Sequence, residues 1–304
     1  MRSARHEWPV WSTTAAVVTA PEVLEPSVRL VESVLAEVDA ACSRYRTDSE
    51  LARAGRALAG GVEVSPMLAA LIEGALEAAR RTDGAVDPTL GAELDALGFG
   101  RGIDVVDVSL EPGGPVVRPR RGWADIRLRD RRLSVPDGVE LDLGASGKAL
   151  AADLAAHTVH DRFGAGVLVS LGGDIATAGA AGFDWQVLVQ DTADDPAQQV
   201  SLRSGWAMAT SSTRRRRHDW AGQEVHHILD PRTGLPAAPV WRSVTVVAPS
   251  CLLANAYSTA AVVNGHRAPA WLASRQVTAR LVDSAAAVVT VGRWPAQGGG
   301  DRRG

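Results

Sequence analysis

Residues 141–174 read LDLGASGKALAADLAAHTVHDRFGAGVLVSLGGD, and this stretch decides the fold. A strand-like start runs into a glycine-bearing turn, a helix follows from about Ser146 to Phe163, and Gly164 closes it. The segment GVLVSL then predicts a strand that leads into the tight turn before Asp174. Free backbone N–H groups at the start of the helix favour phosphate oxygens, and Lys148 adds a positive charge there. A purely structural turn fits these residues equally well, because neither a P-loop nor the G-x-G-x-x-G pattern is present.

Outside this stretch, helices and strands follow one another irregularly. Apolar residues recur at helical spacing after Pro26 and after Pro66, and a further helix is predicted over about 250–264. Strands are predicted for Trp11 to Ala20, WQVLVQ, RSVTVVA and AAVVTVG, and short antiparallel strands within 101–140. Because regular βαβ alternation is missing, we expect an α+β fold with mixed sheets and helices, arranged in two lobes. We expect residues 1–290 to form a single domain and 291–304 to be a disordered tail with nothing to bury.

Composition restricts the class of protein. The 304 residues are 46% hydrophobic and 22% charged, which is typical of a globular chain, and the formal net charge of −3 gives no global basic field for nucleic acid. The two cysteines, Cys42 and Cys251, form neither a disulfide framework nor a CxxC metal site. No long uncharged apolar run predicts a membrane span, and the N-terminal apolar stretch is interrupted by Thr13 and Thr14, so we expect a cytoplasmic protein without a signal peptide.

Several polar segments have both a functional and an ordinary interpretation. SRYRTDSEL (43–51) could bind an anion or stack on a ring, or it could be a solvated helix exit. TDGAVDPTLG (82–91), followed by LGFG (97–100), lets backbone approach a flat or phosphorylated ligand, although a connecting turn explains it too. The LGGD sequence (171–174) is compatible with an ordinary turn that leaves Asp174 at a sheet edge.

The densest polar cluster is HHILDPRTG (226–234). Adjacent side chains of an extended segment point to opposite faces, so only one of His226 and His227 can enter a shared site. A zinc motif is not indicated, because neither H-x-x-x-H nor paired cysteines lie nearby. On the predicted helix after Pro249, Asn255 and Thr259 share one face, and two stacked oxygens suit Mg²⁺. Polar positions on a half-exposed helix are the alternative.

Taken together and in order, these segments resemble the ApbE family, the FAD:protein FMN transferases. The resemblance also includes ATSS (209–212) and VTVVAPSCLLANAYSTA (244–260), and it runs from about residue 11 to 290. It implies that FAD binds in a central cleft with Mg²⁺ at its pyrophosphate. It further implies that the FMN half passes to a threonine or serine hydroxyl of an acceptor flavoprotein, which releases AMP.

The resemblance also assigns roles to individual residues. It implies contacts with the flavin nucleotide from Tyr45, Leu97, Gly98, Phe99, Gly144, Lys148, Thr210 and Ser211. It implies metal contacts from the backbone oxygen of Gly147 and from Asn255 and Thr259. His227 would sit beside the reacting phosphate as a base or orienting group, with Thr210 and Ser211 in the same cleft.

The chain departs from the family pattern in three places. Asn255 stands where the family usually has aspartate, so magnesium affinity should fall unless a carboxylate such as Asp174 or Asp230 approaches. Ala145 and Ala149 replace two glycines of the glycine-rich turn. The run from Arg214 to Arg217 replaces a Gly-Asp-Tyr sequence; we favour a solvated flap over a lid on phosphate or a contact for an acidic acceptor.

Two other functions remain open at this point. One is an FAD-binding or storage protein that lacks transfer activity. The other is an FAD pyrophosphatase that gives FMN and AMP. For a transferase, the missing export signal favours a cytoplasmic acceptor, such as a reductase with an FMN-binding threonine.

Overall fold

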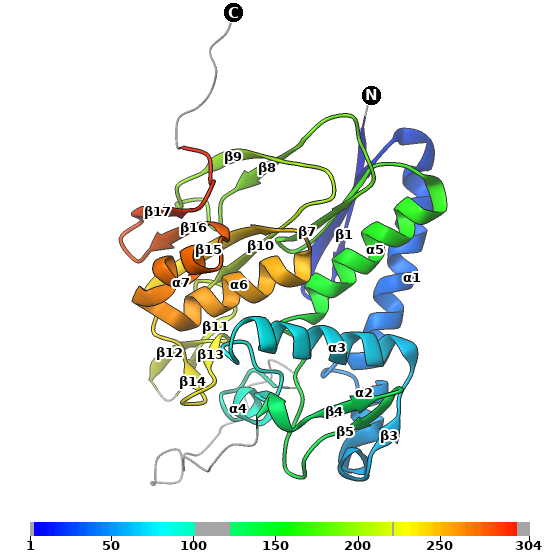
Figure 1. The fold of residues 1–304 in the computed structure, drawn as a ribbon, viewed down its shortest axis with the longest axis vertical. Coiled ribbons are helices and arrows are strands. Elements are labelled where there is room, and N and C mark those ends of the chain that lie inside the picture. Colours follow the sequence, from blue (N-terminus) through cyan, green and yellow to red (C-terminus); the bar gives the residue numbers. More distant parts are fainter. Residues whose placement is uncertain (1–2, 101–121, 221, 297–304) are drawn as a thin grey trace, which may run out of the picture.

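The computed structural model describes residues 3–100, 122–220 and 222–296. At its centre lies an eight-stranded sheet in the order β1-β2-β6-β7-β10-β15-β16-β17 (Figure 1). Every neighbouring pair in this sheet is antiparallel. The strands are β1 (Ala4–Val10), β2 (Thr13–Thr19), β6 (Val167–Leu171), β7 (Asp174–Ala178), β10 (Ala207–Ser212), β15 (Trp241–Ala248), β16 (Thr278–Asp283) and β17 (Val288–Val291). The predicted α+β class is confirmed, whereas the division into two lobes stays a prediction.

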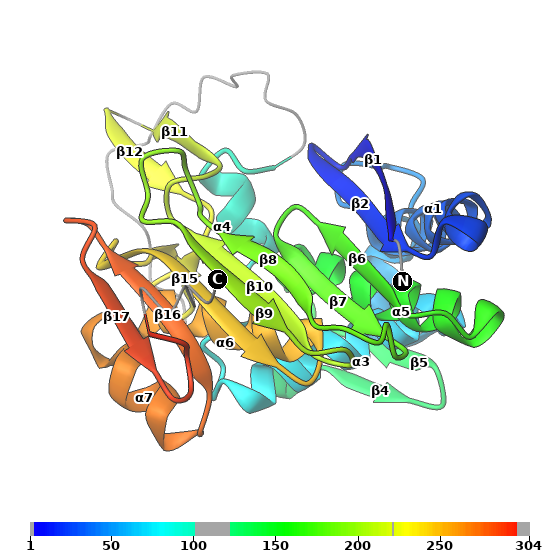
Figure 2. The ribbon, with the colours of Figure 1, turned by 90° about the horizontal axis from the view of Figure 1, so that it is seen from above.

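Helices cover one face of this sheet (Figure 2). α5 packs on β6 and β7, α6 packs on β10 and β15, and α1 and α3 pack against these helices. The helices are α1 (Leu24–Cys42), α3 (Pro66–Arg81), α5 (Gly147–Phe163), α6 (Cys251–Asn264) and α7 (Ala268–Ser274). Five alanines of α5 and four of α6 are buried, so both helix backbones can approach the sheet and each other closely.

Smaller elements surround this frame. On the opposite face of the sheet, the hairpin of β8 (Trp185–Val189) and β9 (Gln198–Leu202) buries Trp185 against Leu168 and Met208. A three-stranded sheet is formed by β3 (Val62–Glu63), β4 (Arg127–Arg129) and β5 (Arg132–Ser134). The remaining elements are α2 (Glu50–Ala54), α4 (Gly91–Ala96), β11 (Arg217–Trp220), β12 (Gln223–His226), β13 (Leu229–Asp230) and β14 (Leu235–Pro236), with 3₁₀ turns at Pro21–Val23, Gly55–Gly60, Trp123–Asp125 and Gly265–Arg267.

The helix predicted over Ser146 to Phe163 is confirmed, and Gly164 ends it in the left-handed conformation. The strand predicted at its start is wrong. Leu141–Leu143 form no strand, because their backbone bonds to the loop beneath: the Asp142 N–H donates to the Pro88 carbonyl at 2.8 Å. The strand predicted for Trp11 to Ala20 is instead one half of a hairpin. Its tight turn places Trp11 and Ser12 at φ 46° and 62°, a left-handed conformation that these two residue types do not predict.

The predicted tail needs one correction. Trp294 is buried, and its indole N–H donates to Oε1 of Gln198 at 2.9 Å, so this part of residues 291–304 does have something to bury. Residues 297–304 lie outside the described residues, as does 101–121 of the segment predicted to form short strands; β4 and β5 confirm strands in its remainder. Within the described ranges, no helix combines the length and apolarity that crossing a membrane requires.

We expect Gly166→Ala to destabilise the protein by about 2 kcal/mol, as overpacking typically does. A Cβ at position 166 would lie 2.7 Å from the backbone N and Cα of Ala181, which cannot give way without moving the chain. Gly60→Ala is the matched control, because a Cβ there meets nothing within 4 Å. The free energies of unfolding from urea denaturation check this; equal values for the two variants would contradict it.

Candidate active site

Tyr45 lies beside the arginine turn of residues 214–217. Its side chain is 54% exposed, and its hydroxyl accepts a hydrogen bond of 2.7 Å from Nη2 of Arg216. The segments 43–51 and 209–217, far apart in the sequence, therefore meet here. The position of Tyr45 next to a second predicted site segment agrees with its expected role, which stays a prediction.

Arg44 connects three of the predicted segments. Its guanidinium pairs with Asp142 at 2.5 Å, pairs with Asp95, and donates to the Gly91 carbonyl at 3.3 Å. Asp142 in turn accepts the backbone N–H of Gly144 at 2.8 Å. No role was expected for Arg44 or Asp142, because no local pattern connects two residues that are 98 positions apart. Their ion pair fixes the glycine-rich turn that precedes α5.

The Leu97–Phe99 loop packs against two histidines. The side chains of Leu97 and Phe99 are buried in a small cluster with Val225 and Leu229, whereas Gly98 is exposed. The ring of Phe99 lies 4.5 Å from that of His218 and 6.4 Å from that of His227. A flat ligand on this loop would therefore meet the Gly98 backbone before the two buried side chains.

The two adjacent histidines have different surroundings, as the sequence predicts. His226 is buried and satisfied: its Nε2 lies 2.9 Å from the Ala237 carbonyl, and its Nδ1 accepts the Ile228 N–H at 3.3 Å. By contrast, Nδ1 of His227 is buried without a hydrogen-bond partner among the described residues. Burial, and then the charges of Arg216 and Lys148, lower the pKa of His227 to about 3. His227 is thus neutral; a backbone hydrogen bond with Arg215 opposes the fall in its pKa, whereas its Nδ1 has no partner among the described residues.

Asp174, Asn255 and Lys148 form the centre of the site. Asp174 begins β7 and is buried, and its Oδ1 accepts a hydrogen bond of 3.0 Å from Nδ2 of Asn255 on α6. Burial raises the pKa of Asp174, while the charge of Lys148 and this hydrogen bond oppose the rise. Oδ1 of Asn255 is buried and lacks a partner within the described part of the chain. Asp174 is therefore the carboxylate that approaches Asn255, one of the two that the sequence analysis considered.

Asp230, the other carboxylate considered, is held within its own turn. Its carboxylate accepts hydrogen bonds of 2.7–3.2 Å from the Arg232 guanidinium, which keeps the pKa of Asp230 low despite its partial burial. Arg232 thus stabilises the turn that follows the two histidines.

Thr210 and Ser211 do not line one surface. Ser211 faces the helix layer, where its hydroxyl lies 2.8 Å from those of Ser258 and Thr259. Thr210 leaves the opposite face of β10 and bonds to Thr245 at 2.9 Å. Adjacent strand residues alternate between faces, so the two side chains leave β10 on opposite sides, and a place for both residues in one cleft stays a prediction. Ser211 joins the Thr259 group, and the role of Thr210 stays a prediction.

Asp153 is a residue that the sequence analysis missed. It sits on α5, and its carboxylate accepts the backbone N–H groups of Cys251 at 2.8 Å and Leu252 at 2.9 Å. These are free donors at the N-terminus of α6, where a negative charge is also favoured by the helix dipole. Asp153 therefore joins the helix that carries Gly147 and Lys148 to the helix that carries Asn255 and Thr259. An aspartate in the middle of an alanine-rich helix was its only signal.

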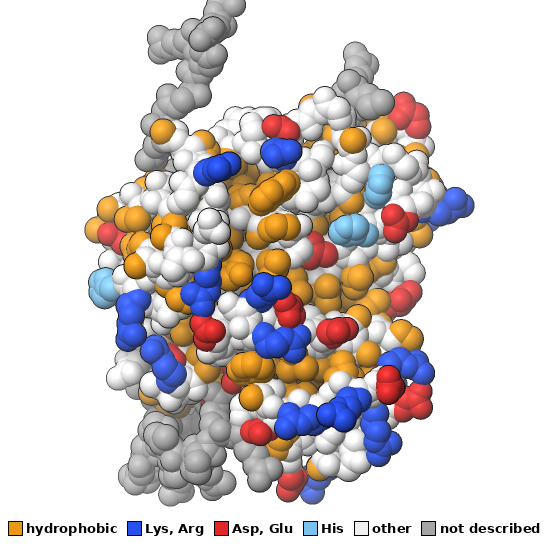
Figure 3. All heavy atoms as spheres, viewed as in Figure 1, with side chains coloured by type: hydrophobic (Ala, Val, Ile, Leu, Met, Phe, Trp, Pro, Cys, Tyr) orange, Lys and Arg blue, Asp and Glu red, His pale blue; other side chains and the backbone are white. Residues whose placement is uncertain are grey.

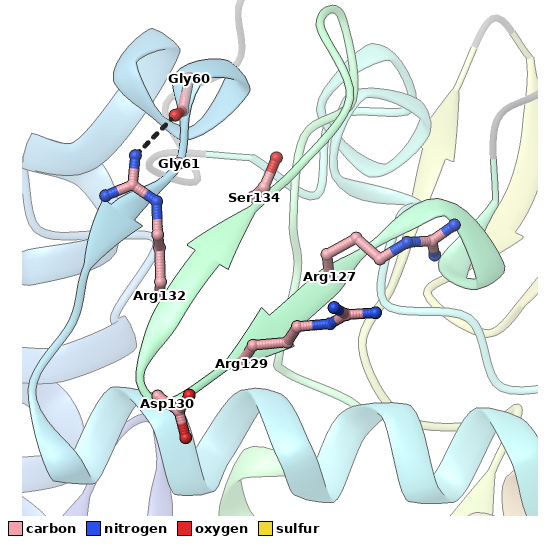
Figure 4. A pocket seen from close by; sticks show the side chains of 7 residues that line it. All are labelled: Gly60, Gly61, Arg127, Arg129, Asp130, Arg132 and Ser134. Atoms are coloured by element: carbon pink, nitrogen blue, oxygen red, sulfur yellow. Dashed lines mark hydrogen bonds between the residues drawn. The ribbon is translucent and has the colours of Figure 1, made fainter.

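A cavity of about 610 Å³ lies elsewhere, on the outer face of the β3-β5-β4 sheet (Figure 4). Arg127, Arg129 and Arg132 line it, and Figure 3 shows basic side chains gathered over this part of the molecule. None of the predicted site residues lines this cavity. We place the site instead where the family segments meet.

Fold and site together define an α+β protein with a polar site at the start of two neighbouring helices. It belongs to the ApbE family, whose model matches residues 11–281. The chain is 29% identical over 268 residues to the FAD:protein FMN transferase of Salmonella typhimurium, covering 84% of this chain and 76% of the relative. It is 32% identical over 267 residues to the FAD:protein FMN transferase of Treponema pallidum, with 78% and 70% covered.

Solved structures agree with this assignment. The ApbE protein of Thermotoga maritima superposes with a TM-score of 0.81 at 27% identity, covering 95% of this chain and 97% of that one. The apo flavinyl transferase ApbE of Pseudomonas stutzeri gives a TM-score of 0.78 at 25% identity, with 95% and 94% covered. The predicted family and fold are therefore confirmed.

The low pKa of His227 predicts a pH dependence of stability. Below pH 6.5, the ordinary pKa of an imidazole, His227 is protonated in the unfolded chain. In the folded chain it stays neutral until the pH falls to about 3. The free energy of unfolding therefore decreases as the pH is lowered from 6.5 to about 3. We expect the free energy of unfolding of His227→Gln to depend less steeply on pH than that of the wild type. The two slopes should differ by up to about 1.4 kcal/mol per pH unit. Urea denaturation across the window measures this, with the exposed His157→Gln as control; equal slopes for both variants would contradict it.

Proposed function

We propose that this chain transfers FMN from FAD to a threonine or serine hydroxyl of an acceptor protein, with release of AMP. The observation that carries the proposal is the gathering of family segments around His227, whose neighbours include Phe99, Lys148 and Arg216. Two relatives with this name, which align over most of the chain, support it.

The residues at the start of α6 fit Mg²⁺. Oδ1 of Asn255 is a buried oxygen without a partner among the described residues, and an oxygen that accepts no hydrogen bond is free to bind a hard cation. Thr259 presents a hydroxyl one turn further along, and Asp174 places a carboxyl group next to the Asn255 amide. Together with the Gly147 carbonyl, these groups would hold the ion. When bound at the pyrophosphate, Mg²⁺ would neutralise charge that develops during phosphoryl transfer.

FMN transfer requires one bond to form, one bond to break and one proton to move. The acceptor hydroxyl oxygen bonds to the phosphorus on the FMN side, the bond from that phosphorus to the oxygen that stays on AMP breaks, and the hydroxyl proton must leave. His227 takes or orients this proton, since its imidazole is neutral at physiological pH. A base with a pKa of about 3 is weak, but the diphosphate offsets the charges of Arg216 and Lys148 and thereby raises that pKa on binding.

The acceptor is a flavoprotein with a modifiable threonine or serine, and we propose that it lies in the cytoplasm. Two alternatives use the same site. Transfer of phosphorus to water would make the protein a pyrophosphatase that yields FMN and AMP. Binding without turnover would make it a flavin-storage protein.

Mass spectrometry of an acceptor domain incubated with the protein, FAD and Mg²⁺ separates these functions. A mass gain of one FMN supports transfer. AMP release without labelling of the acceptor would favour the pyrophosphatase, and intact bound FAD would favour storage.

If Asn255 contacts the metal, its truncation should weaken magnesium dependence. We expect Asn255→Ala to raise the Mg²⁺ concentration for half-maximal AMP release by about tenfold or more, because an oxygen ligand is lost. Asn264→Ala is the matched control: it lies on the same helix and bonds to the Ala260 carbonyl of its own helix at 2.9 Å. A magnesium titration in which both variants match the wild type would remove Asn255 from the metal site.

If His227 handles the proton, its loss should affect turnover more than binding. We expect His227→Ala to keep FAD affinity within about threefold, while the rate of FMN transfer falls by about a hundredfold or more. Flavin fluorescence titration and single-turnover labelling measure the two quantities, with exposed His157→Ala as control. An unchanged rate would remove His227 from the mechanism.

A further inference from the structure

The arginine turn of residues 214–217 is fixed at both ends. Nε of Arg215 lies 2.7 Å from Oδ1 of Asp191, a side chain that is only 3% exposed. Arg217 pairs with Glu224 and donates to the Thr213 carbonyl. Two of the four arginines therefore have carboxylate partners, which a freely solvated flap would not require.

Arg216 differs from both of these neighbours. Its backbone has φ 51°, a left-handed conformation that is uncommon for a residue with a side chain. Its Nη2 donates to the hydroxyl of Tyr45, and among the described residues no carboxylate pairs with its guanidinium. A neutral phenol orients the guanidinium without neutralising its charge, so the side chain remains available for an anion.

The positive charge of Arg216 lies close enough to His227 to affect its pKa. After burial, it is the largest contribution that lowers the pKa of His227, and Lys148 acts in the same direction. Two cations thus surround an imidazole that stays neutral. Each is costly while no anion is present, and each becomes favourable when a diphosphate binds.

We propose that Arg216 is a substrate-binding residue whose guanidinium contacts a phosphate of FAD. The proposal rests on the proposed function and adds a phosphate contact from the turn where this chain carries four arginines. Asp191 and Glu224 hold the turn, Tyr45 aims the side chain, and the planar guanidinium matches phosphate oxygens in a bidentate geometry.

Arg214 provides a matched control. It is exposed in the same turn, its guanidinium has no partner among the residues that the structure describes, and its loss changes the net charge equally. Comparing Arg216→Ala with Arg214→Ala therefore separates a specific contact from a general loss of positive charge. Arg216→Lys tests whether the charge alone suffices.

The test is titration of purified wild type and variants with FAD in the presence of Mg²⁺, followed by flavin fluorescence. We expect Arg216→Ala to raise the Kd for FAD about tenfold or more, as the loss of a charge-assisted hydrogen bond typically does, and Arg214→Ala to change it less than about twofold. Arg216→Lys should recover part of the affinity. Affinity for riboflavin, which has no phosphate, should be equal in wild type and Arg216→Ala.

Repeating the FAD titration at several salt concentrations gives a second readout. The dependence of log Kd on log salt should be weaker for Arg216→Ala than for Arg214→Ala. Equal FAD affinities for these two variants, or an equal loss for riboflavin and FAD, would overturn the role of Arg216 while the transferase proposal stands. Failure of the wild type to bind FAD would overturn both.

Discussion

Two hydrogen bonds from the N-terminus of α6 to the Asp153 carboxylate set the spacing of the helices from which the candidate site projects. Gly147 and Lys148 begin α5, and Asn255 and Thr259 lie on α6, so this contact joins the two pairs directly, in addition to the packing of both helices on one sheet. The buried alanines of both helices permit the close approach, and the carboxylate satisfies donors that a helix start leaves free. The apolar packing of α5 on α6 and the hydrogen bonds to Asp153 therefore stabilise the same contact between the two helices.

The site brings two cations close to buried polar atoms. Lys148 and Arg216 bring positive charge towards His227, and burial keeps the His227 imidazole neutral. The Asn255 oxygen is buried and has no partner in the part of the chain that the structure describes. Buried polar atoms without partners are unfavourable in a folded protein, and native structures retain few of them. A bound diphosphate with its cation would satisfy these groups at once, which connects the cost in the free protein with the proposed chemistry.

Asn255 on α6 has a carboxyl neighbour from a distant part of the chain. An amide at this position keeps an oxygen but lacks the charge of aspartate. The structure places Asp174, at the start of a different strand, against the amide nitrogen. This contact holds the nitrogen towards Asp174, and the amide oxygen accepts no hydrogen bond from the described residues. A carboxyl group therefore lies beside Asn255, although it comes from β7 and not from α6.

The sequence by itself determined the family, the α+β class, the α5 helix with its glycine end, and the distinction between two adjacent histidines, because these depend on local pattern and on ordered motifs. It missed the first hairpin, since Trp11 and Ser12 turn without the usual residues, and it did not separate the side chains of Thr210 and Ser211, which leave β10 on opposite faces. Only the tertiary structure decided that Arg44 joins Asp142, that Asp153 holds α6, that Asp174 and not Asp230 reaches Asn255, and that Arg216 meets Tyr45. Each of these pairs joins residues far apart in the chain, and no local periodicity records which distant segments the packing of helices on the sheet brings into contact.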